Sequence, residues 1–130
     1  MKIANPNFVL RGKVYLLQSC STCKRILKEV SNFGKFEVID VKINALSIED
    51  VDRLADKAGG YEAIFNKQSL KYRALGLKDK SLTESDYRKF LTEEYTFLKR
   101  PVFIVDNNIY VGNSKSTIKM LTDYLHLTAN

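Results

Sequence analysis

The two cysteines of the chain, Cys20 and Cys23, are separated by two residues. They lie where an expected strand, residues 13–18, gives way to an expected helix, residues 22–33. A Cys-x-x-Cys pair that begins the first helix of a βαβ unit is typical of a thiol–disulfide redox site. Residues three apart on the first helical turn lie on neighbouring positions of one face. One sulfur can therefore attack a target, and the other can resolve the mixed intermediate as a disulfide.

The position of Cys20 at the start of the helix predicts that it is the nucleophile. Unpaired backbone N–H groups and the helix dipole favour negative charge there, and the thiolate is the reactive form of cysteine. Lys24, one turn along, is expected to add positive charge. Cys23 is expected to be more shielded and to act as the resolving thiol. The alternative interpretation is that the two thiols are unreactive neighbours.

A second candidate feature is the pair Arg100-Pro101, which opens the apolar run at residues 101–106. The bond before Pro101 could be cis. If this loop lies against the cysteine-bearing helix, Arg100 would present its guanidinium to a bound oxyanion or to the Cys20 thiolate. Alternatively, Arg100 is a surface charge beside a proline that begins a strand. No metal site is expected, because the two cysteines and His126 give at most three ligands and structural zinc usually takes four.

The composition fits one soluble domain of 130 residues with 45% hydrophobic content. No apolar stretch approaches the length of a membrane span, and residues 1–12 do not read as a signal peptide. A cytoplasmic location is therefore expected. The formal charge of +6 favours anionic partners. The densest basic group is expected to be a solvated helical face, and direct nucleic-acid binding is not expected. Its members are Lys67, Lys71, Arg73, Lys78 and Lys80.

The periodicity of the remaining residues predicts the order β-α-β, helical segment, β-β-α. After the first helix, strands are expected at 36–42, 101–106 and 109–112, and helices at 47–57, 62–65, 70–75 and 83–91. A turn is expected at Asn107-Asn108, and Ser116-Thr117 is expected to cap a last helix. This order matches a thioredoxin-like α/β fold, a mixed sheet flanked by helices. We expect a single domain, residues 1–130, with a helical insertion at about 47–99. Phe8-Val9-Leu10 could add a short strand or pack on the surface.

Several stretches resemble the glutaredoxin-coupled arsenate reductase family and its Spx-type relatives. They are residues 15–24 around the cysteine pair, residues 67–77 with a lysine, a tyrosine and a leucine-glycine step, the Arg-Pro strand at 98–105, and Val111-Gly112. The resemblance covers about residues 13–125. It implies a thioredoxin-type fold and a cysteine that attacks arsenate, with glutathione and glutaredoxin completing the cycle. By position, Cys20 corresponds to the nucleophile and Arg100 to an oxyanion-binding arginine. The matching substrate-binding positions are Ser21, Thr22, Lys24, Asn66 and Pro101.

The chain departs from the reductases at three places. Asn66 stands where they use a second arginine, and Gly112-Asn113 where they use a third. Losing two of three cationic groups should weaken arsenate binding. Cys23 is the third departure, since the glutaredoxin-coupled reductases usually lack cysteine there. Spx-type proteins have it, and in them the pair is an oxidation switch on a regulator that binds RNA polymerase. Those proteins usually keep the middle arginine, which Asn66 replaces here.

The sequence therefore predicts a thiol–disulfide oxidoreductase of arsenate reductase-like type, with Cys20 as nucleophile and Cys23 as resolving thiol. The expected substrate is a small oxyanion, a thiol or a disulfide. No bound cofactor is expected, and glutathione with glutaredoxin, or thioredoxin, would be the electron donor and redox partner. The first alternative is a non-enzymatic, Spx-type redox-sensing regulator that binds an RNA polymerase subunit. The second is a binding domain whose cysteines have no role.

Overall fold

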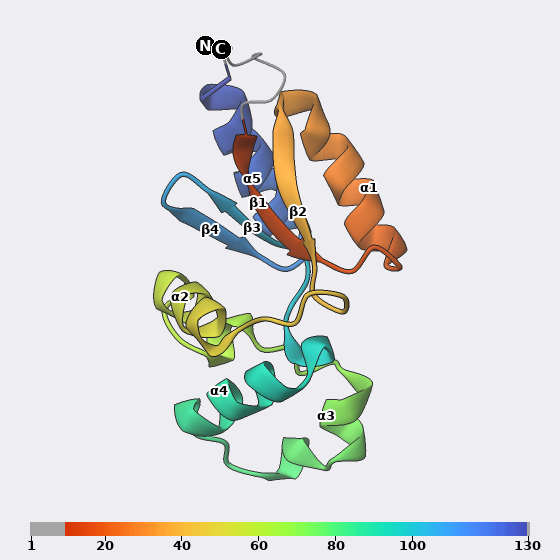
Figure 1. Cartoon of the computed structure of the whole chain (residues 1–130), viewed down its shortest axis with the longest axis vertical. Coiled ribbons are helices and arrows are strands. Elements are labelled where there is room, and N and C mark those ends of the chain that lie inside the picture. Colours follow the sequence, from red (N-terminus) through yellow and green to blue (C-terminus); the bar gives the residue numbers. More distant parts are fainter. Residues whose placement is uncertain (1–9, 130) are drawn as a thin grey trace. The chain divides into compact units, whose positions relative to one another are not determined.

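This computed structural model describes residues 10–129, and their elements follow the order expected from the sequence (Figure 1). The described residues form two compact units, residues 10–40 with 100–129, called here the sheet unit, and Val41–Lys99, called the helical unit. The helical insertion expected at about 47–99 falls inside the helical unit. That the whole chain is a single domain stays a prediction. No helix in residues 10–129 is long and apolar enough to cross a membrane.

The sheet unit contains a four-stranded mixed sheet with the strand order β2-β1-β3-β4. Its elements are β1 (Leu10–Leu16), α1 (Ser21–Val30), β2 (Lys35–Asp40), β3 (Val102–Val105), β4 (Asn108–Val111) and α5 (Lys115–Leu127). β1 and β2 are parallel, as the intervening helix requires. β3 pairs antiparallel with both β1 and β4. The predicted thioredoxin-like α/β fold is confirmed.

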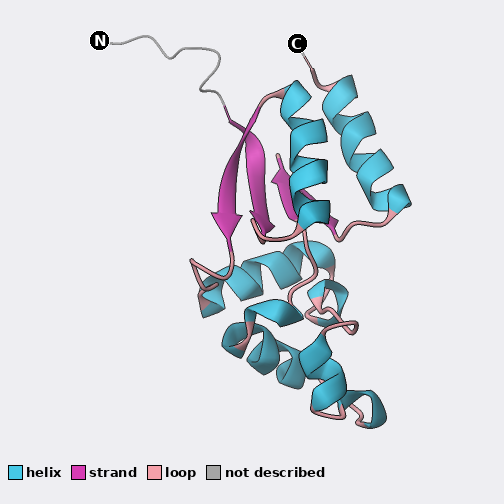
Figure 2. Ribbon diagram, turned by 90° about the vertical axis from the view of Figure 1, so that its right-hand side faces the viewer, coloured by secondary structure: helices cyan, strands magenta, loops and turns pink. Residues whose placement is uncertain are grey.

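The core of the sheet unit lies between one face of the sheet and helices α1 and α5, which lie side by side (Figure 2). Alternate residues of a strand point to the same face, and residues three, four or seven apart on a helix share a stripe. These two periodicities select the buried cluster. Its members are Val14, Leu16, Cys23, Ile26, Val30, Phe103, Val105, Tyr110, Leu121 and Leu125.

The helical unit contains α2 (Ile48–Ala58), α3 (Leu70–Ala74) and α4 (Glu84–Glu93), joined by short 3₁₀ turns. Phe65 is its aromatic centre, stacked on Phe97 with ring centroids 4.9 Å apart. On its surface Arg88 of α4 donates two hydrogen bonds to Asp52 of α2, at 2.8 and 3.1 Å. Tyr61 donates a third to the same carboxylate, which holds the two helices together.

The structure corrects two boundaries and places one residue of a segment that was left open. α5 is capped by Ser114, not by Ser116-Thr117, because the Ser114 hydroxyl oxygen accepts a hydrogen bond from the Thr117 N–H group at 3.1 Å. The β3–β4 turn is Asp106-Asn107 and not Asn107-Asn108, because Asp106 takes up the left-handed conformation at φ 55°. Of Phe8-Val9-Leu10, Leu10 begins β1, and the other two lie outside the described residues.

Gly12 should be intolerant of a side chain. A Cβ atom there would overlap the backbone carbonyl oxygen of Ile104 on β3 and crowd Val105. We predict that Gly12→Ala lowers the free energy of unfolding by about 3 kcal/mol, because the two strands must separate to make room. Urea denaturation measures the loss.

The matched control is Gly112→Ala in the same unit. Gly112 has a φ of 88°, and a Cβ atom added there would meet no other atom within 4 Å, so only backbone strain opposes alanine. We expect a loss of about 1 kcal/mol. Equal losses for the two variants would contradict the overlap at Gly12.

Candidate active site

Cys20 is the N-cap residue of α1, reached from β1 through a tight turn. Its N–H group donates to the Leu17 carbonyl at 3.0 Å, and its own carbonyl accepts the Lys24 N–H bond at 3.1 Å. Its extended backbone, at φ −88° and ψ 116°, is the usual conformation of an N-cap. The other described α-helices are capped by a serine or threonine hydroxyl: Ser47, Ser69, Thr83 and Ser114. At α1 a sulfur takes this place.

The surroundings of Cys20 favour its thiolate. Partial burial by itself would raise the pKa, but three groups outweigh it and hold the pKa of Cys20 below its ordinary value. These are the backbone amides of Cys23 and Thr22, the Cys23 thiol, and the positive charge of Arg100. No hydrogen bond of full capping geometry joins the sulfur to an amide, so the amides act as nearby positive ends of dipoles. Cys20 is half-buried and therefore reachable from solvent.

Cys23 has the opposite environment. It is 1% exposed and belongs to the core between the sheet and α1. Burial, followed by its hydrogen bond to Cys20 and the charge of Cys20, raises the pKa of Cys23 to about 11. Both cysteines are free thiols. The pair therefore consists of an accessible sulfur with a low pKa and a shielded sulfur with a high pKa, one helical turn apart.

Arg100 and Pro101 lie at the same edge of the sheet as Cys20. Because β3 runs antiparallel to β1 with Val102 opposite Tyr15, the residues before β3 come beside the end of β1. The bond between Arg100 and Pro101 is cis. Atom Nη1 of Arg100 is buried and has no hydrogen-bond partner among the described residues. A buried guanidinium nitrogen without a partner is a donor available to an anion.

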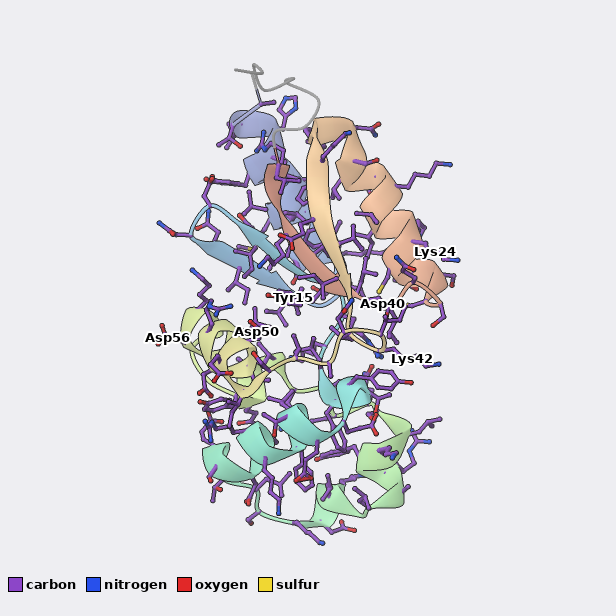
Figure 3. The ribbon with its side chains drawn as sticks, viewed as in Figure 1. Tyr15, Lys24, Asp40, Lys42, Asp50 and Asp56 are labelled. Atoms are coloured by element: carbon purple, nitrogen blue, oxygen red, sulfur yellow. The ribbon has the colours of Figure 1, made fainter. Side chains whose placement is uncertain are left out.

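The remaining predicted site residues are placed as follows. Ser21 and Lys24 are exposed on the first turns of α1, and Thr22 is half-buried (Lys24 is labelled in Figure 3). Pro101 is buried. Asn66 belongs to the helical unit, where its side chain is used locally. Its Oδ1 accepts the Gln68 N–H bond at 3.0 Å, and its Nδ2 reaches the Thr96 carbonyl at 3.5 Å.

Asp40, the last residue of β2, also lies beside the turn that leads to Cys20 and was not among the predicted site residues (Figure 3). Its Oδ2 accepts the N–H bond of Gln18, in the turn that leads to Cys20, at 3.0 Å. The signal in the sequence was an acidic residue on the same face of the expected strand as Phe36 and Val38. His126 is exposed and makes an edge contact with the Phe33 ring at 6.3 Å between centroids. No three His, Cys, Asp or Glu side chains within residues 10–129 are grouped to hold a metal ion.

Comparison with known proteins identifies several that are similar to this chain in sequence or in structure. The chain is 29% identical over 103 residues to YusI, an uncharacterized protein of Bacillus subtilis. The matched region covers 75% of this chain and 86% of YusI. A structure of a possible arsenate reductase from Streptococcus mutans is 26% identical, with a TM-score of 0.70, and covers 88% of this chain and 99% of that protein.

An arsenate reductase from Vibrio cholerae shares the fold, with a TM-score of 0.73 at 19% identity over 88% of this chain and 98% of that protein. The family model for the ArsC family matches residues 15–121, a span that contains both cysteines, Arg100 and the whole helical unit. The chain belongs to the ArsC family.

Proposed function

We propose that this protein is a thiol–disulfide oxidoreductase in which Cys20 attacks the substrate and Cys23 resolves the intermediate. The ArsC family and the reductase-like structures support a thiol oxidoreductase-like function. The observation that carries the finer assignment is the contrast between the two thiols. Cys20 is accessible with a lowered pKa, and Cys23 is buried one turn away with a raised pKa.

The reaction follows from this contrast. The Cys20 thiolate attacks one sulfur of a substrate disulfide, forms a mixed disulfide, and the other substrate sulfur leaves as a thiolate that takes up a proton. Cys23 then loses its proton and attacks the Cys20 sulfur. This step forms the Cys20–Cys23 disulfide and releases the second substrate thiol. Two electrons have passed to the substrate, and two thiols of a reducing partner restore the pair.

The raised pKa of Cys23 is compatible with its resolving role. Burial is the largest cause, but the hydrogen bond to Cys20 and the charge of Cys20 also raise this pKa. Both of these causes disappear once Cys20 is bonded to substrate. The Cys23 thiol therefore becomes easier to deprotonate only after the first step, which keeps it inactive until the mixed disulfide exists.

The substrate class that fits best is a disulfide or a mixed disulfide with a small thiol. Arsenate reduction in the related enzymes would use two further arginines, and here Asn66 and Gly112-Asn113 occupy those positions. Asn66 already satisfies its hydrogen bonds within the helical unit. Arg100 remains as a donor to the thiolate or to an anionic group of the substrate. The proposed reductants are glutathione with glutaredoxin, or thioredoxin, in the cytoplasm.

The first prediction concerns the reactivity of Cys20 in a Cys23→Ser background, which leaves a single thiol. The rate of alkylation by iodoacetamide should rise with pH through a midpoint below the ~8.5 of a free cysteine, because the thiolate is stabilised at the N-cap. The rate is measured by mass spectrometry from pH 5 to 10. A midpoint at or above ~8.5 contradicts the proposed nucleophile.

Turnover separates the roles of the two cysteines. With a glutathione mixed disulfide as substrate and no added thiol or glutaredoxin, the reduced parent should complete one turnover and end with the Cys20–Cys23 disulfide. Cys20→Ser should not react, because the accessible sulfur is lost and Cys23 is buried. Cys23→Ser should form the mixed disulfide with Cys20 and then stall. Arsenate serves as the comparison substrate and should be reduced far more slowly. Equal activity of the parent and Cys20→Ser would refute the assignment.

Arg100 should contribute through its charge. In the single-thiol background, Arg100→Ala should raise the alkylation midpoint of Cys20 by up to about one pH unit, because a stabilising cation is removed. Arg100→Lys keeps the charge and should stay near the parent value. An unchanged midpoint in Arg100→Ala would show that Arg100 does not act on the thiolate.

A redox-sensing regulator is the second candidate, and the cysteine pair itself favours it, because Spx-type relatives use such a pair as an oxidation switch. This function predicts a reversible Cys20–Cys23 disulfide after mild peroxide, absent from Cys20→Ser and Cys23→Ser, together with capture of RNA polymerase subunits. Mass spectrometry and a pull-down with purified polymerase test it. Disulfide formation without turnover and with polymerase binding would favour the regulator over the oxidoreductase.

A further inference from the structure

The turn that carries Cys20 is held by contacts of its backbone. The Cys20 N–H group donates to the Leu17 carbonyl at 3.0 Å, and the Leu17 backbone is also hydrogen-bonded to the Cys23 sulfur. Gln18 and Ser19 at its tip are exposed, so their side chains do not anchor the turn in the core. The position of the sulfur therefore depends on whatever holds this backbone in place.

Asp40 supplies an anchor from a different strand. Its Oδ2 accepts the Gln18 N–H bond at 3.0 Å. The pairing of β1 with β2 explains the geometry, because Leu16 lies opposite Asp40. Both strands end at the same edge of the sheet, and the chain leaving β1 passes over the end of β2.

The burial of Asp40 indicates that this contact is specific. Its exposed fraction is only 8%, and a carboxylate removed from water is costly unless hydrogen bonds compensate it. A hydrogen bond between a charged acceptor and a backbone amide is among the stronger ones in proteins. The carboxylate thus fixes the first residue of the turn tip, two residues before the nucleophile.

We propose that Asp40 is a positioning residue that holds the Cys20 turn through the Gln18 amide and thereby keeps the sulfur at the amino end of α1. This role rests on the proposed function, in which Cys20 is the nucleophile. Asp40 acts through the backbone and not on the substrate.

The direction in which the pKa of Cys20 moves when Asp40 is replaced separates a positioning role from a simple effect of charge. Removing a negative charge near Cys20 would by itself lower the pKa of the thiol. Loss of the anchor should raise it, because the sulfur drifts away from the amides of Thr22 and Cys23 and from Arg100, which together favour the thiolate. Asp40→Asn removes the charge and keeps an oxygen that can accept the Gln18 bond, whereas Asp40→Ala removes both.

The experiment measures the alkylation midpoint of Cys20 with iodoacetamide in full-length Cys23→Ser protein, with or without each Asp40 change. We expect Asp40→Ala to raise the midpoint by about half a unit to one unit, and Asp40→Asn to leave it at or below the parent value. An unchanged or lowered midpoint in Asp40→Ala overturns the proposal. So does an equal rise in both variants.

Asp106→Ala is the matched control. This carboxylate accepts a hydrogen bond from the Tyr124 hydroxyl, but it lies at the β3–β4 turn, at the end of β3 opposite Arg100. Its loss should leave the Cys20 midpoint unchanged. A rise equal to that of Asp40→Ala would show that lower stability, and not position, moves the midpoint, and would overturn the proposal. Thermal unfolding establishes that each variant is folded.

The midpoint of the parent protein separates the proposed nucleophile from the proposed role of Asp40. If the parent midpoint is already at or above ~8.5, the proposed nucleophile is wrong. If the parent midpoint is low and Asp40→Ala does not raise it, only the positioning role of Asp40 is wrong.

Discussion

The pairing of β1 with both of its neighbours is the constraint on which the site depends. The parallel partner β2 ends opposite the end of β1, with Asp40 beside Leu16. The antiparallel partner β3 begins at that same edge, with Val102 beside Tyr15. The strand pairing therefore brings together the turn before α1, Asp40 and the loop with Arg100. Side chains then decide what chemistry this edge can support.

Burial accounts for the different environments of the two cysteines. Two residues of the same type, three positions apart on one helix, would have similar acidity in water. At the N-cap the sulfur meets backbone amides and a cation, whereas one turn deeper the sulfur is enclosed by the core of the sheet unit. The difference in pKa therefore arises from the helix geometry and the packing of α1 on the sheet, and the proposed order of reaction of the two thiols is based on it.

The sequence predicted the element order and the strand directions because those depend on local periodicity. The stripe of Ile26 and Val30 and the apolar run of β3 were sufficient. It also placed both cysteines at the start of α1. Boundaries were missed where one side chain decides them, as at Ser114 and Asp106. Asp40 was missed because its hydrogen bond joins residues 22 positions apart, and only the strand register brings such residues together.

Asn66 is an amide at a position where the sequence resemblance would place an arginine. Its side-chain oxygen accepts a hydrogen bond from the Gln68 N–H group and so closes a local turn. An amide carries no net charge, so it offers an oxyanion less than an arginine would. In the proposed function, anion stabilisation depends instead on groups of the sheet unit, namely the amides at the start of α1 and Arg100. Those groups act on the Cys20 sulfur itself, and a site that stabilises a thiolate more than it grips a tetrahedral anion is suited to exchange between thiols and disulfides.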